Sequence, residues 1–177
     1  MAAKYTIKGN TGEAASRDLM ITYLNTGTTS APVWSAMGRT VEDSSVEYDY
    51  SQETKTDILG ETRVTAKTPT VTQTFSGNNL LAGDAVLNHI LDMNVVRRNI
   101  SEALNQDVLI AHLYLTDSED KPFAERWKSS SVLMTTNGGA GGEMLASDIE
   151  VTYGGERVTG TISKGAGGAI EFTADAT

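Results

Sequence analysis

Stretches in which polar and apolar side chains alternate place the strongest constraint on the fold of this chain. Between residues 45 and 51, Val46, Tyr48 and Tyr50 alternate with polar or acidic residues. Successive side chains of a β-strand point to opposite faces, so this period of two predicts a half-buried strand with one wet, acidic face. Residues 61–67 and 70–75 alternate in the same way and are rich in Thr and Val, which favour strands. We expect these segments to form long hairpin strands.

The rest of the sequence predicts a mainly β fold. Thr, Ser and Val are abundant, and 17 glycines and three prolines supply turns between short strands. Residues 107–116 are apolar on both faces, which predicts a central strand. Gly154-Gly155-Glu156 separates two strand-forming segments and predicts a hairpin between them. The further predicted strands are residues 19–24, 33–37, 123–134, 147–153 and 157–163, with an edge strand at 169–172.

One stretch predicts a helix. It follows Gly83-Asp84, where Asp84 can act as the N-cap. Leu87, Ile90, Leu91 and Val95 recur on one face, and Arg97 and Arg98 lie at the end where the helix dipole favours cations. We expect the apolar face to pack on the core, and Asn88, Arg97 and Arg98 to face a neighbouring copy in an assembly.

The length of 177 residues fits a single domain with a sufficient hydrophobic core. Residues 1–18 are polar and aperiodic, so we interpret them as an N-terminal arm that packs when a partner receives it. The domain proper is then residues 19–177. The sequence contains no cysteine, which excludes disulfides and thiol chemistry. It also shows neither a signal-peptide core nor an apolar run long enough to cross a bilayer, so no membrane association is expected.

The acidic residues are concentrated in one segment. The net charge is −9, which disfavours neutralising contacts with nucleic-acid phosphates. Residues 42–61 contain seven carboxylates and a single cation, Lys55, and so supply −6 of this total. Such a run is often the solvated face of a strand and its turn. It can also line an acidic channel.

We find no combination of residues that indicates catalysis, a cofactor or a metal. His89 and His112 lack the spacing of a metal site. Ser129-Ser130-Ser131 lacks the glycines of a nucleophile elbow. The glycine-rich stretch 137–142 lacks the Lys-Ser/Thr end of a phosphate-binding loop and predicts a flexible loop. Acidic pairs such as Glu47 and Asp49 are ordinary alternation on a strand. We therefore expect a protein that is not an enzyme.

Several local patterns occur in a familiar order along residues 19–116. They are Trp34 and Gly38, the acidic Glu47-Tyr48-Asp49, then Asp57-Ile58-Leu59-Gly60, the Thr-rich strand around Pro69, and the helix after Gly83-Asp84. In this order the sequence resembles the tail tube proteins of tailed bacteriophages and of phage-derived particles such as tailocins. The same fold is shared by the tube of type VI secretion systems, so fold alone does not separate these functions.

The resemblance implies a structural virion protein with a small β-sandwich or barrel, one flanking helix and long hairpins. Six copies would form a ring, and the rings would stack into a tube that conducts DNA during ejection. The implied partners are other copies of the chain and other tail proteins, namely the tape measure, the terminator, the baseplate and a sheath. The implied location is the virion tail, assembled in the host cytoplasm. The resemblance does not distinguish a flexible tail from a contractile one. Nor does it distinguish a DNA-carrying phage from a tailocin.

A closed β wall around an aqueous bore needs about 16 or more strands, so subunits of this length must pool their strands. If the acidic segment lines that bore, DNA passes without contacts that would hold its phosphates. The candidate lumen-lining residues are Glu47, Asp49, Glu53, Asp57 and Glu61.

A second hypothesis is a β-sandwich module that binds carbohydrate or a cell surface on a phage-like particle. Such a module needs exposed aromatic side chains. The chain has only two Trp and three Phe, and Trp34 and Trp127 are more typical of core or interface positions.

Overall fold

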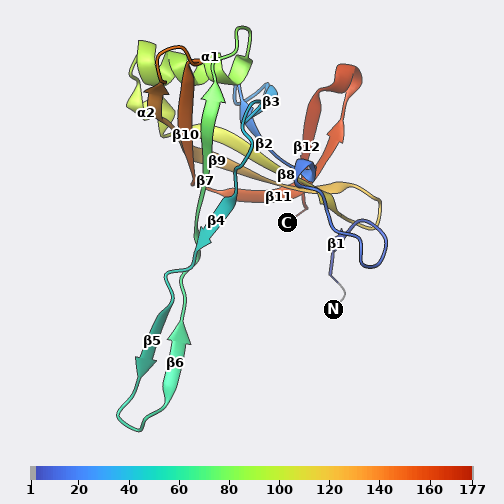
Figure 1. Cartoon of the computed structure of the whole chain (residues 1–177). Helices are drawn as coiled ribbons and strands as arrows, with labels where there is room; N and C mark the ends of the chain where they lie inside the picture. Colours follow the sequence, from blue (N-terminus) through green and yellow to red (C-terminus); the bar gives the residue numbers. More distant parts are fainter. Residues whose placement is uncertain (1–2, 177) are drawn as a thin grey trace.

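The computed structural model describes residues 3–176 and shows a mainly antiparallel β fold with one principal helix (Figure 1). This confirms the fold class predicted from the alternating segments. The strands are β1 (Thr6–Ile7), β2 (Met20–Asn25), β3 (Trp34–Ala36), β4 (Val46–Asp49), β5 (Glu53–Thr56), β6 (Thr62–Thr65), β7 (Thr70–Asn79), β8 (Gln106–Thr116), β9 (Pro122–Gly138), β10 (Ala146–Tyr153), β11 (Arg157–Lys164) and β12 (Ile170–Ala174). The helices are α1 (Ala85–Leu91) and α2 (Ile100–Ala103), with a π-helical turn at Asp92–Val96 and short 3-10 turns at Arg17–Leu19 and Ala166–Gly168.

Ten strands within the described residues form one hydrogen-bonded sheet, in which every pairing is antiparallel. Its main path runs β3-β2-β8-β9-β10-β7-β4, while β1 pairs with β8, β11 with β9, and β12 with β11. The central position predicted for residues 107–116 is confirmed, because β8 lies between β2 and β9 and is mostly buried. The predicted edge strand is also confirmed, since β12 pairs with β11 alone.

The hairpin predicted around Gly154-Gly155 is wrong. β10 and β11 do not pair with each other; instead, both lie along β9, with Thr152 opposite Ser131 and Arg157 opposite Trp127. The chain therefore continues past the glycines instead of reversing. A Cβ on Gly154 would lie 2.7 Å from the carbonyl oxygen of Ser129, so the glycine permits this close approach. The actual hairpin joins β9 to β10, with Gly138 opposite Ala146.

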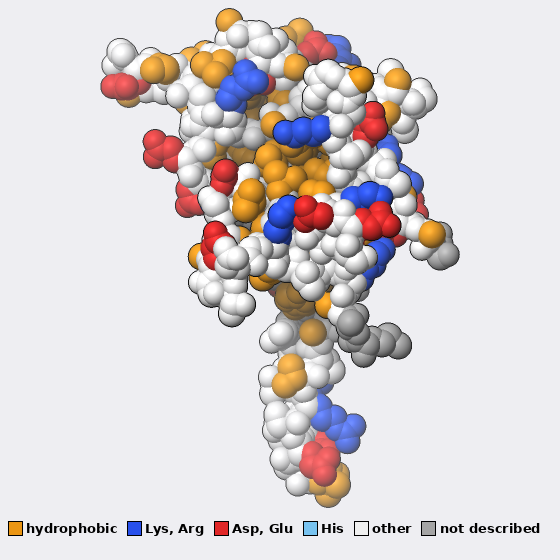
Figure 2. All heavy atoms as spheres, turned by 90° about the vertical axis from the view of Figure 1, so that its right-hand side faces the viewer, with side chains coloured by type: hydrophobic (Ala, Val, Ile, Leu, Met, Phe, Trp, Pro, Cys, Tyr) orange, Lys and Arg blue, Asp and Glu red, His pale blue; other side chains and the backbone are white. Residues whose placement is uncertain are grey.

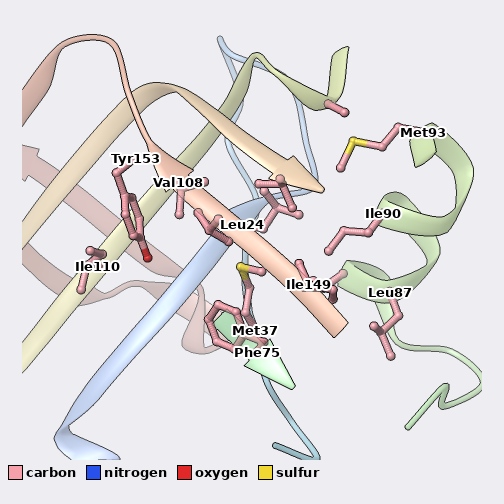
Figure 3. Close-up of a cluster of buried hydrophobic side chains, with 14 of the residues drawn as sticks. Leu24, Met37, Phe75, Leu87, Ile90, Met93, Val108, Ile110, Ile149 and Tyr153 are labelled. Atoms are coloured by element: carbon pink, nitrogen blue, oxygen red, sulfur yellow. The ribbon is translucent and has the colours of Figure 1, made fainter. Parts of the chain in front are cut away.

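The main core lies between the principal helix and the sheet (Figure 3). Asp84 caps α1 as predicted, because its carboxylate accepts hydrogen bonds from the N–H groups of Val86 and Leu87 at 2.9 and 3.0 Å. Leu87 and Ile90 are buried as expected, but Val95 is exposed. The reason is the π-helical turn, whose wider winding moves the following side chains around the axis and buries Met93 instead.

A buried polar network ties β2, β7 and β10 together inside the curled sheet. Gln73 on β7 accepts hydrogen bonds from the hydroxyls of Thr22 and Tyr153, at 2.8 and 2.5 Å, through one amide oxygen. Its amide nitrogen donates to the hydroxyl of Ser44 at 2.9 Å. Burial raises the pKa of the Tyr153 hydroxyl, so it stays a neutral donor. The network fixes how the two ends of the sheet approach each other.

A second, smaller apolar cluster covers the other face of β2, β8 and β9. Its buried members are Tyr23, Trp34, Leu109, Ala111, Ala124 and Ile162, and Ile21, Leu113, Ile170 and Phe172 pack against it only partly buried. The β11–β12 hairpin stands over one side of this cluster (Figure 1). The cluster is therefore less completely covered than the main core.

Candidate functional site: a projecting hairpin

The most conspicuous feature is a ribbon that projects from the body (Figure 1). It starts where β4 pairs with β7, with Val46 opposite Gln73 and Asp49 opposite Thr70. It continues through a hydrogen bond from Lys67 N–H to the Tyr50 carbonyl oxygen at 2.9 Å. It ends in the β5–β6 pair, which forms a separate two-stranded sheet. The long hairpin strands predicted from the alternating segments are therefore present.

The strand predicted at residues 45–51 is present, but the prediction that its apolar face is buried is wrong. Tyr48 and Tyr50 are 47% and 46% exposed, and only Val46 packs against the main core. The physical reason is that β4 leaves the body as it runs along the ribbon. The alternation predicted the strand correctly, but beyond Val46 its apolar face is only partly covered within the described part of the chain.

The tip of the ribbon is closed by Asp57. Its carboxylate accepts hydrogen bonds from the N–H groups of Leu59 and Glu61 at 2.9 and 3.0 Å. Gly60 has a φ of 82°, a left-handed conformation that glycine adopts without strain. This turn leaves Ile58 fully exposed and Leu59 82% exposed. Two large apolar side chains at the far end of a projection are typical of a contact surface.

The two faces of the β5–β6 pair differ in chemistry. Glu53 lies opposite Thr65 and Lys55 opposite Arg63, so the charged side chains share one face. The other face carries Thr54 opposite Val64 and Thr56 opposite Thr62. All eight residues are exposed. The ribbon thus presents a charged face and an uncharged face of β-branched residues.

The structure places all five predicted lumen-lining carboxylates on this ribbon. Glu47 and Asp49 lie on β4, Glu53 on β5, and Asp57 and Glu61 at the tip. The ribbon also carries three cations, Lys55 on the outgoing strand and Arg63 and Lys67 on the returning one, so residues 46–70 have a net charge of −2. Lys55 lies 3.5 Å from Glu53, and Arg63 lies 3.7 Å from Glu61. The ribbon is therefore only mildly acidic, and the lumen assignment stays a prediction.

The three predicted interface residues lie apart from the ribbon, on the helical segment. Asn88 is exposed on α1. Arg97 bonds within its own segment, donating to the Asp92 carboxylate at 2.6 Å and to both carboxylate oxygens of Glu102. These carboxylates hold the pKa of Arg97 above its usual range, and Arg97 lowers the pKa of Glu102. Their role in contacts with a neighbour stays a prediction.

A buried ionic group that the sequence analysis missed lies on β8, β9 and β11. The Glu125 carboxylate is 3.1 Å from His112 Nε2 and accepts a hydrogen bond from Arg157 Nε at 2.5 Å. Burial opposes ionisation of Glu125, but these two partners outweigh it and lower its pKa. His112 also lies 3.0 Å from the Tyr114 hydroxyl. Nothing in the local sequence distinguishes Glu125 from a surface acid, because its partners come from other strands.

The remaining candidates from the sequence are part of the scaffold. Trp34 is buried and Trp127 is half-buried, so neither forms an exposed platform for a sugar. Residues 3–176 contain no group of three or more His, Asp or Glu side chains arranged to hold a metal ion. No helix in the same residues is both long and apolar enough to span a membrane.

Comparisons with known proteins give structural likeness but no sequence relative. No family model and no curated protein matches the sequence. Among solved structures, the chain is similar to the sheath/tube terminator of the extracellular contractile injection system PVC, at 9% identity and a TM-score of 0.49 over 85% of this chain and 99% of that one. It is similar to the tube-terminating cap of the anti-feeding prophage, at 12% identity and a TM-score of 0.48 over 87% and 95%. It is also similar to a chain of the PVC sheath-tube complex, at 10% identity and a TM-score of 0.43 over 80% and 88%.

Proposed function

We propose that this chain is a structural subunit whose copies form rings that stack into the tube of a bacteriophage tail or a tail-like particle. The observation that carries the proposal is the projecting ribbon, which consists of residues 46–73 and reaches well beyond the body (Figure 1). Beyond the hydrogen bond between Lys67 and Tyr50, the ribbon is exposed and each of its strands pairs only with the other within residues 3–176, so we expect a neighbouring copy to cover it.

The β5–β6 pair at the end of the ribbon is too small to be stable by itself. A two-stranded hairpin is at best marginally stable in water. The backbone groups on the outer edges of β5 and β6 are unpaired in the described chain, since each strand pairs only with the other. Unpaired edges readily accept further strands. Ribbons from adjacent copies can pair edge to edge and so satisfy these groups.

Edge pairing also explains how a chain of this size can enclose a channel. A β wall around an aqueous bore needs about 16 or more strands, more than one chain of this size can supply, so several copies must pool their strands. The uncharged face of β5 and β6 can then pack on protein, while the face with Glu53, Lys55 and Arg63 faces water. This face itself carries two cations and one carboxylate, but over residues 46–70 five carboxylates outnumber three cations. That excess would weakly repel DNA phosphates, which suits a conduit for DNA ejection.

The remaining details of the proposal come from the sequence resemblance to tail tube proteins. They are six copies per ring, a location in the virion tail after assembly in the host cytoplasm, and contacts with the tape measure, terminator, baseplate and, in a contractile particle, the sheath. Such a protein has a mechanical role and does not need an active site.

Electron microscopy of the purified protein tests the proposal. We expect negative-stain images to show rings or hollow tubes at high protein concentration. A variant in which two glycines replace residues 52–66 keeps the pairing of β4 with β7 and serves as the control. We expect it to fold with an unchanged unfolding midpoint but to form no tubes. A full-length protein that stays monomeric at high concentration contradicts the proposal, as do tubes formed by the shortened variant.

A further inference from the structure

Two exposed apolar surfaces lie on opposite sides of the body. One, the helical corner, consists of Val95, Val96, Ile100 and Leu104 around the turn between the π-helical segment and α2, with Arg98 among them. The other, the β12 groove, is lined by Pro32, Trp34, Arg126, Ile170, Glu171 and Phe172. Figure 1 shows the helical segment and the β11–β12 hairpin on opposite flanks.

The helical corner is apolar and exposed. Val96 is 75% exposed and Ile100 is 59% exposed. Arg98 stands beside them in a left-handed conformation, with a φ of 48°. It differs from its neighbour Arg97, because it forms no ion pair with any described residue. The corner thus combines exposed aliphatic side chains with one uncompensated positive charge.

The β12 groove is apolar and concave. It holds a cavity of about 290 Å³ at the open edge of the second apolar cluster, and Figure 2 shows hydrophobic side chains gathered in the middle of this face. Two charged side chains line it. Arg126 is already neutralised, since its guanidinium donates to both carboxylate oxygens of Asp107 at 2.8 and 2.5 Å. Glu171 forms no ion pair within residues 3–176, so the groove keeps one uncompensated negative charge.

Symmetry explains why one chain would carry two such different surfaces. A ring closes through a heterologous contact, in which one patch of each copy meets a different patch of the next. The two patches must lie on opposite flanks, both should be apolar, and their charges should be opposite. The helical corner and the β12 groove meet these conditions, because Arg98 and Glu171 are their uncompensated charges.

We propose that the helical corner of one copy inserts into the β12 groove of the next copy, with Arg98 facing Glu171 across the contact. This inference rests on the proposed ring and names the contact that closes it. It places Val96 and Ile100 against Trp34, Ile170 and Phe172, so the partly covered second cluster becomes a complete core in the assembly.

Disulfide cross-linking between single-cysteine variants tests the contact, because the natural chain has no cysteine. Val96→Cys places a thiol on the corner, and Ile170→Cys places one in the groove. Glu171→Cys is a second groove variant at an exposed position, in case Ile170→Cys fails to fold. We expect an oxidised mixture of a corner variant and a groove variant to form at least tenfold more disulfide dimer than either variant alone. The control is Ser118→Cys, in an exposed turn, mixed with Ile170→Cys.

The outcomes separate this inference from the proposed function. Tubes that form without a corner–groove disulfide above the control overturn the inference and leave the tube assignment standing. A strong disulfide in protein that never forms rings supports the contact and refutes the tube. Protein that neither assembles nor cross-links refutes both.

Charge reversal provides an independent measurement. We expect Arg98→Glu and Glu171→Arg each to raise the protein concentration needed for assembly by about tenfold, because each places like charges across the contact. The double variant restores opposite charges and should assemble near the original concentration. If both single variants fold normally but the double variant does not regain the original assembly concentration, the two residues do not face each other.

Discussion

Replacing the two apolar residues at the tip of the ribbon should separate assembly from folding. We consider the double variant Ile58→Ser/Leu59→Ser. Ile58 is fully exposed and Leu59 is 82% exposed in the single chain, so neither contributes packing to the folded monomer. If the ribbon contacts neighbouring copies, these side chains become buried only in the tube. The substitution should therefore weaken assembly and leave the free energy of unfolding of the monomer unchanged.

The size of the effect follows from the area that the two side chains can bury. Full burial of an Ile or Leu side chain stabilises by about 1.5–3 kcal/mol. Half-burial of both together therefore contributes about 1.5–3 kcal/mol per subunit. Since 1.4 kcal/mol corresponds to a factor of ten in an equilibrium constant, the critical concentration for assembly should rise about 10- to 100-fold.

Two measurements check this prediction. Pelleting over a range of concentrations gives the critical concentration, and urea unfolding below that concentration gives the stability of the monomer. Met144→Ser is the matched control, because Met144 is also highly exposed but lies in the loop between β9 and β10. An unchanged critical concentration for the tip variant refutes a role of the tip in assembly. A lower urea midpoint refutes the claim that the tip adds nothing to the monomer.

Three further predictions concern the channel, the helix and the buried ionic group. Replacing Glu47 and Asp49 by Lys should still allow tubes to form but should slow DNA release from particles, and an unchanged release rate would exclude both residues from the lumen. Asp84→Ala removes two hydrogen bonds from the start of α1 and should lower the free energy of unfolding by about 1 kcal/mol, measured against urea. Glu125→Gln should cost about 1–3 kcal/mol at pH 7. Because the pKa of Glu125 is lowered in the folded state, its contribution is present above the ordinary glutamate pKa and disappears as the pH falls through the folded-state value. The variant should therefore lose less stability than the natural protein between pH 5 and more acidic conditions, and a parallel loss in both would contradict this reasoning.

Features set by neighbouring residues could be predicted from the sequence. The cap at Asp84 depends on N–H groups two and three residues away, so the sequence contains every participant. The burial of β8 follows from a strand that is apolar on both faces. In each case, the pattern and its cause lie within one short segment.

Features that interrupt a regular pattern or depend on distant parts of the chain were not predictable. The exposure of Val95 follows from a π-helical turn that no local sequence pattern indicates. The glycines after Tyr153 are compatible with a hairpin turn, and only the presence of Ser129 on β9 shows that the chain runs straight on. The burial of Tyr48 could not be read from its alternation, because alternation shows which residues share a face but not whether anything covers that face. The β12 groove could not be predicted either, because its lining residues Trp34 and Phe172 are far apart in the sequence.

The length of β9 has a consequence for how the protein unfolds. This single strand of 17 residues supports both apolar clusters, because its first half pairs with β8 and β11 and its second half pairs with β10. Neither cluster can open without removing a hydrogen-bonding partner from the other. Both halves also depend on contacts between residues far apart in the chain, which slow folding. The body should therefore behave as one cooperative unit that forms slowly and, once formed, unfolds as a whole and not one cluster at a time.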